Sequence, residues 1–156
     1  MNRLFCFFWA IWWGIACFTD VSGGLKKLNL IDYKWAFADN FDFLVSCLSI
    51  YSPPLSFVVF LFVGIILWCG LSSALFIRAS YQILKKQDYA QALTLAYQVS
   101  LALWLVFFLA DQLVMKFDLE ENHMVQGGFE FLGFIAFTIT SQMKHTRDDL
   151  LGKTLS

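Results

Sequence analysis

Long apolar runs separated by short polar connectors dominate the chain. The longest run, residues 89–110, holds 22 residues without a charged side chain. As an α-helix rising 1.5 Å per residue it would extend about 33 Å, which matches the hydrocarbon core of a bilayer. The pattern therefore predicts a membrane span over residues 89–113.

A second apolar run covers residues 55–77, directly after Ser52-Pro53-Pro54. A serine followed by proline is typical of a helix start, because serine caps the free N–H groups and proline has none to lose. The run is long enough to cross a bilayer. It is predicted to be a second span.

The first run is shorter, with 16 charge-free residues over 4–19. That length gives about 24 Å of helix, so crossing the membrane over residues 4–21 would place Asp20 at the headgroup level. A cleaved signal peptide is the alternative, because Arg3 precedes a short apolar stretch. Three tryptophans in this stretch are unusual in a signal core and favour a retained span.

The last apolar run carries an acid. Its charge-free part, residues 131–143, has 13 residues and is too short to cross, whereas residues 124–143 make 20 and do reach. Glu130 would then lie inside the membrane. The four runs together predict an all-α, up-down, four-span transmembrane helix bundle in which residues 1–156 form a single domain.

The connection over residues 22–54 is the only long one. It opens on the breaker cluster Ser22-Gly23-Gly24 and then mixes charged with aromatic residues, which suits the membrane interface. Apolar residues at helical spacing predict an amphipathic helix over 40–51, capped by Asp39 or Asn40 and lying on the membrane. An irregular loop packed over the bundle is the alternative.

The composition agrees with a bilayer environment and limits the partners. The chain is 59% hydrophobic and only 15% charged, too apolar for so small a soluble globule. The net charge of -1 and the absence of a basic patch argue against nucleic acid.

Positive charges set the expected orientation in a bacterial-type inner membrane. A four-span topology puts seven Lys/Arg residues on one side (Arg3, Arg78, Lys85, Lys86, Lys144, Arg147, Lys153) and four on the other (Lys26, Lys27, Lys34, Lys116). Both termini are therefore predicted to be cytoplasmic.

Small residues at i, i+4 spacing predict faces where helices approach closely. The expected helix-packing positions are Gly70, Ala74, Ala92, Ala96, Ser100 and Gly133. Such faces would serve contacts within the bundle, with a second copy, or with other membrane subunits.

Two carboxylates and a histidine form the candidate ion or proton site. Glu130 and Asp111 would lie at similar depth on neighbouring helices, and His123 lies seven residues before Glu130 on the same helical face. The functional interpretation is a proton or cation site. The structural one is that Glu130 accepts hydrogen bonds and fixes helix pairing, and it is favoured because Glu130 would lie at a shallow depth.

Other chemistry has little support in the sequence. Cys17 and Cys47 would both lie near the outer face, where a disulfide is possible, but buried unpaired thiols are favoured. Neither a C-x-x-C pair nor a metal-ligand spacing occurs, so neither a cofactor nor a metal is expected.

Two short segments carry a resemblance. Residues 40–45 (Asn-Phe-Asp-Phe-Leu-Val) with Leu48-Ser49, and residues 127–131 (Gly-Gly-Phe-Glu-Phe), are similar to a bacterial family of predicted small integral membrane proteins of unknown function. Cys47, Ile50 and Tyr51 replace the His, Met and Asp of that family, and the Trp beside the glutamate is absent. The resemblance implies four helices and no catalytic residue.

These patterns predict a non-enzymatic accessory or scaffold subunit acting through helix contacts. A bundle this small has little room for a substrate cavity, whereas its small-residue faces suit partner helices. The alternative is a small transporter or proton-coupled permease that uses Glu130 and Asp111.

Overall fold

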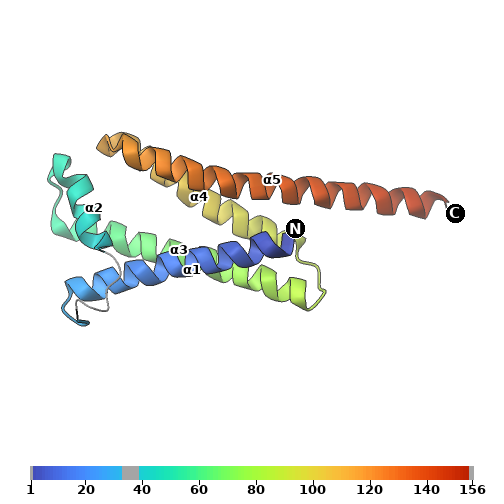
Figure 1. Ribbon diagram of the computed structural model, residues 1–156, viewed down its shortest axis with the longest axis horizontal. Coiled ribbons are helices and arrows are strands. Elements are labelled where there is room, and N and C mark those ends of the chain that lie inside the picture. The colour runs from blue at the N-terminus through green and yellow to red at the C-terminus, as the bar shows by residue number, and fades with distance from the viewer. Residues whose placement is uncertain (1, 33–38, 155–156) are drawn as a thin grey trace.

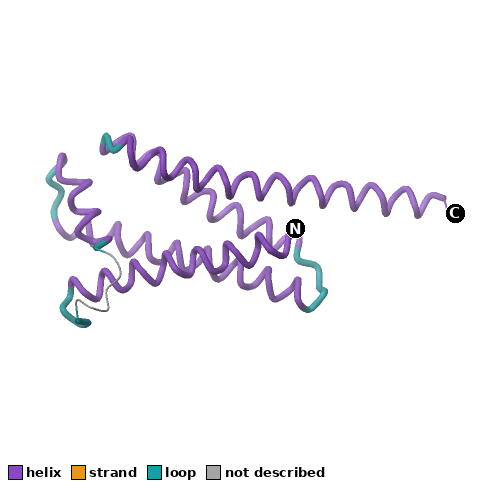
Figure 2. Tube along the Cα trace, viewed as in Figure 1, coloured by secondary structure: helices purple, strands orange, loops and turns teal. Residues whose placement is uncertain are grey.

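The computed structural model describes residues 2–32 and 39–154, and this part of the chain is helical without strands. In order it forms α1 (Asn2–Lys27), α2 (Asn40–Leu48), the 3-10 turn η2 (Ser49–Tyr51), α3 (Leu55–Leu84), α4 (Ala90–Val114) and α5 (Phe117–Thr154). The four long helices run alternately in opposite directions (Figure 1). Short loops join α3 to α4 and α4 to α5 (Figure 2).

Three helices are long and apolar enough to cross a membrane: α1 from Arg3 to Lys27, α3 and α4. Helix α5 extends past the ends of the other helices (Figure 1). The fold is therefore all-α with three membrane-competent helices.

The predicted break after the first span is wrong. Helix α1 passes through Ser22, Gly23 and Gly24 and ends at Lys27. Glycine inside a helix costs only about 1 kcal/mol, which packing can offset. The Ser22 hydroxyl donates to the Phe18 carbonyl at 2.8 Å, and a Cβ on Gly24 would lie 3.2 Å from the Phe62 ring, so the segment is close to α3.

The predicted start of α3 needs correction as well. Its N-cap is Pro54, in extended conformation, whereas Ser52 has a left-handed φ of 46° and makes no side-chain cap. The helix continues seven residues beyond position 77, to Leu84. Ala79 and Ile83 are buried on this last stretch, so tertiary packing extends the helix past Arg78.

The last helix, α5, begins seven residues before the predicted span over residues 124–143. The α4–α5 turn consists of Met115, with a left-handed φ of 55°, and Lys116, and α5 begins at Phe117. Asp118 and Glu120 lie in its first turn. Acidic side chains are stabilising there, because the helix N-terminus carries partial positive charge.

Helix α2 forms where the sequence predicts a helix, with Asp39 at its N-cap position but without a side-chain cap bond. The Phe41 ring meets the Phe62 ring of α3 edge-on, with centroids 5.2 Å apart. Helix α2 therefore packs over the end of the bundle, although Val45 of α2 and Tyr51 of η2 are exposed.

Three polar links hold the start of α2 to the end of α1. Lys26 pairs with Asp39, Lys27 pairs with Asp42 at 2.7 Å, and the Asn40 amide donates to Asp20 at 2.5 Å. Asp20 is 9% exposed, so this carboxylate is buried rather than open at the surface.

Helices α1 and α3 make the most extensive contact in the bundle. Helix α4 packs against α3, and α5 packs against α4. The core is aromatic and includes Trp9, Trp13, Phe76, Tyr97, Leu103 and Trp104. Between α1 and α3 the Ser73 hydroxyl donates to the Ala10 carbonyl at 2.9 Å. A Cβ on Gly14 would lie 3.2 Å from that hydroxyl oxygen, so the missing side chain lets the two helices approach.

Candidate functional site

One face of α5 lies against α4 and carries His123, Gly127 and Glu130 at i, i+4 and i+7. Gly127 sets the separation of the two helices. A Cβ there would lie 2.9 Å from Phe108 and 3.0 Å from Trp104, closer than real Cβ atoms approach. The glycine therefore brings the α5 backbone within reach of the Trp104 side chain.

Glu130 is fully buried and forms three hydrogen bonds with side chains of two other helices. Its Oε2 accepts from the Trp104 indole of α4 at 2.6 Å. Its Oε1 contacts the Ser100 hydroxyl of α4 at 2.5 Å and accepts from the Trp13 indole of α1 at 3.4 Å. We call this arrangement of Trp13, Ser100 and Trp104 around Glu130 the carboxyl cradle.

The cradle joins three helices through uncharged donors. The Trp13 and Trp104 rings also contact one another, with centroids 5.2 Å apart. A buried carboxyl group without partners would cost several kcal/mol, and each donor of the cradle reduces that cost. Breaking the cradle would therefore loosen α1, α4 and α5 together.

Asp111 pairs with His123 rather than with Glu130. His123 Nδ1 lies 2.5 Å from Asp111 Oδ2, with the Asp111 side chain 7% exposed and that of His123 25% exposed. The His123 ring stacks on Phe107 at 5.0 Å and contacts Trp104 at 5.8 Å. The three predicted site residues thus fall into two groups: Asp111 and His123 form a pair, and Glu130 lies in the carboxyl cradle. Trp104 contacts both His123 and Glu130.

The predicted helix-packing residues differ in how deeply they are buried. Ala96 and Ser100 are fully buried and Ala92 packs partly against the core, whereas Ala74 is exposed. A Cβ on Gly70 would lie 3.4 Å from Cys17 of α1. The buried residues in this half of α3 are Cys69, Ser72, Ser73, Phe76, Ala79, Ser80 and Ile83, so Cys69 and Ser73 are buried one residue before the predicted Gly70 and Ala74.

Gly133 is buried one turn after Glu130. A Cβ there would lie 3.1 Å from the Tyr97 hydroxyl and 3.6 Å from Phe5. The position therefore brings α5 close to both α4 and α1.

Sequence reasoning missed the donors of the cradle. Trp13 and Trp104 lie in apolar runs and resemble ordinary core or interface aromatics. A signal was present, because an indole N–H buried in a bundle needs an acceptor and Glu130 is the only carboxyl group in the last apolar run. Asp20 was also missed as a buried group.

The cysteines are free thiols. The Cys17 thiol points to the Ile66 carbonyl at 3.6 Å, and Cys47 is buried in α2. Burial is the main cause that raises the pKa of the Cys47 thiol. In the described residues, no three His, Cys, Asp or Glu side chains are placed to hold a metal ion.

The fold and site define an all-α protein with membrane-competent helices around a buried carboxyl group. Comparison with protein-family models, with curated proteins and with solved structures finds no match.

Proposed function

We propose that the chain is a four-span protein of a bacterial-type inner membrane and that it acts as a non-enzymatic accessory or scaffold subunit. The observation that carries this proposal is the carboxyl cradle. Glu130 is buried without exposed surface and bound across two helix contacts, as expected of a group that fixes helix pairing. A transported proton or cation would need an open path to the carboxyl group.

The fourth span would be the middle of α5. Residues 124–143 would extend about 30 Å, enough to cross the hydrocarbon core. The large hydrophobic residues exposed along it are Met124, Val125, Phe129, Phe131, Leu132, Ile135, Ile139 and Met143. An apolar outer face with Glu130 on the inner face suits a helix between lipid and bundle.

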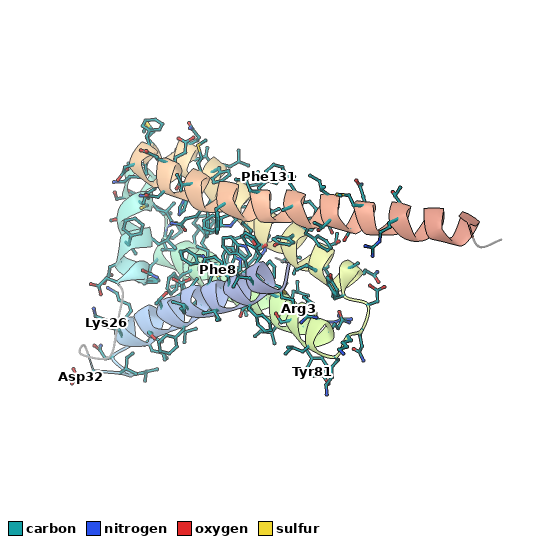
Figure 3. All side chains as sticks on the ribbon, turned by 45° about the vertical axis from the view of Figure 1, so that its right-hand side comes forward. Arg3, Phe8, Lys26, Asp32, Tyr81 and Phe131 are labelled. Carbon is teal, nitrogen blue, oxygen red and sulfur yellow. The ribbon has the colours of Figure 1, made fainter. Side chains whose placement is uncertain are left out.

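We place both termini in the cytoplasm. The N-terminus of α1 and the C-terminal end of α5 lie toward the same end of the molecule (Figure 1). Arg3 lies near this end, whereas Lys26 and Asp32 lie at the other (Figure 3). The larger number of Lys and Arg residues at the Arg3 end supports this orientation.

Partner helices would bind the exposed faces rather than the cradle. Gly64 of α3 and Gly128 of α5 have open space where a Cβ would stand, and Phe60 and Leu132 beside them are exposed. Lipid or a helix of a second copy or of another membrane subunit could cover these faces. The scaffold proposal requires that at least one of them contacts protein.

Two measurements test the function together. A photo-crosslinking residue at Phe60 or Leu132 should yield discrete larger products in native membranes. The same residue at Ile11, which is exposed on α1, shows what products form at another face.

Wild-type protein in liposomes should carry no proton or cation flux above empty liposomes. A flux that Glu130→Gln abolishes, in a variant that still folds, would overturn the scaffold proposal in favour of the transporter.

A further inference from the structure

The Ser100 hydroxyl has more acceptors around it than it has hydrogens. Its Oγ lies 2.9 Å from the Ala96 carbonyl oxygen, 3.2 Å from the Tyr97 carbonyl oxygen and 2.5 Å from Glu130 Oε1. A hydroxyl group carries one hydrogen and can accept through its lone pairs. A contact of 2.5 Å between two oxygens needs a hydrogen between them, because otherwise lone pairs would face each other.

Two hydrogen arrangements fit these oxygen positions. With an ionised Glu130, Ser100 donates to Oε1 and gives up its bond to the helix carbonyls. With a neutral Glu130, the carboxyl O–H donates to Ser100 Oγ, and the Ser100 hydroxyl donates to the Ala96 carbonyl. Trp104 donates to Oε2 in both cases. Only the neutral arrangement uses both the short contact and the bond to Ala96.

In the described part of the chain, no positively charged side chain bonds to Glu130. Among the described interactions, its partners are two indoles and a hydroxyl, without a lysine or arginine. The titratable groups on the packed helices are Arg3, Cys6, Cys17, Asp20, Lys26 and Lys27 of α1 and Tyr97 and Asp111 of α4, and the nearest one along α5 is His123. His123 is paired with Asp111, Lys26 with Asp39 and Lys27 with Asp42, and Arg3 is exposed near the start of α1. An unpaired charge is costly in a dry interior.

We propose that Glu130 is a proton-binding site whose carboxyl group holds a proton at neutral pH and donates it in a hydrogen bond to Ser100. The ligand is a proton and the site is closed, so the inference concerns a resident proton rather than transport. It does not depend on the scaffold function. A protonated Glu130 lets a polar side chain join three helices without placing a net charge in the bundle.

Infrared spectroscopy can observe this proton directly. The chain has three glutamates, Glu120, Glu121 and Glu130. Glu121 is exposed near the start of α5, and Glu120 accepts from the Gln112 amide in an exposed hydrogen bond. In full-length protein labelled with ¹³C-carboxyl glutamate and reconstituted at neutral pH, we expect one protonated carboxyl band. Glu130→Gln should remove that band, and the matched control Glu121→Gln should keep it.

Two results would overturn the proposal: no protonated carboxyl band in the labelled wild type, or a band that persists in Glu130→Gln. Ser100→Ala gives an independent test if Glu130→Gln fails to fold. It removes the acceptor of the carboxyl O–H, so the band should remain and move to higher frequency. A band that does not move would contradict the assignment to Glu130 and Ser100.

Discussion

Two buried acids on the α4–α5 pair have opposite kinds of partner. Glu130, in the middle of α5, is fully buried and bound by two indoles and a hydroxyl. Asp111, near the end of α4, is bound by a titratable histidine whose side chain is 25% exposed. In the dry interior the carboxyl group is bound by uncharged partners. At the edge of the bundle, which water can reach, its partner is a side chain that can carry a charge.

The same comparison ranks the energetic weight of the two groups. Losing Glu130 would leave two buried indole N–H groups, one from each of two helices, without an acceptor. Losing Asp111 would leave one histidine with water available to it. We therefore expect the two acids to contribute very unequally to stability, and four predictions concern these two groups and their surroundings.

The largest effect is expected from Glu130→Ala. It leaves the Trp13 and Trp104 N–H groups without an acceptor and creates a cavity, so it should lower the free energy of unfolding by on the order of 4 kcal/mol. Unfolding titration in mixed micelles would measure this. Glu130→Gln is the matched control, because it keeps an acceptor and a donor, and it should cost about 1 kcal/mol. Equal losses for the two variants would show that the cradle hydrogen bonds matter little.

The next effect distinguishes the two indoles. Trp104→Phe removes the 2.6 Å donor to Oε2 and should cost about 2 kcal/mol, whereas Trp13→Phe removes a 3.4 Å donor and should cost about 1 kcal/mol. Both substitutions keep an aromatic ring, so the difference reports the hydrogen bonds. The reverse order in the same titration would mean that Trp13 is the stronger partner.

A smaller effect should come from helix spacing. Gly127→Ala places a Cβ against Phe108 and Trp104, and overpacking of about 1 to 3 kcal/mol is partly offset by better helix propensity. A net loss of about 1 kcal/mol is expected. Gly128→Ala meets open space and should be neutral or slightly stabilising. If the two alanine variants have the same midpoint in the unfolding titration, α5 does not approach α4 through Gly127.

The smallest effect is expected from Asp111→Asn. The asparagine oxygen can still accept from His123, and the partly exposed imidazole can bind water, so the loss should stay below about 1 kcal/mol. The unfolding titration used for Glu130→Ala provides the direct comparison. A loss as large as that of Glu130→Ala would contradict the ranking of the two acids.

Much of the fold follows from the lengths of the apolar runs. The runs at 4–21, 55–77 and 89–113 correspond to α1, α3 and α4, the three helices that can span a membrane. The helix predicted over residues 40–51 from apolar spacing forms as α2 over Asn40–Leu48, and the 3-10 turn η2 follows it. Helix ends were less predictable, because packing carried α1 through Gly23 and Gly24 and extended α3 past Arg78.

Spacing along the chain is enough to show that Glu130 stands within an apolar run and shares a helical face with His123 and Gly127. Only the tertiary structure decided the partners: Trp13, Ser100 and Trp104 for Glu130, and His123 for Asp111. The physical reason is that a hydrogen bond depends on tenths of an ångström between helices. That separation is set by the rotation of each helix and by contacts such as Gly127 on Trp104, which come from residues far apart in the chain.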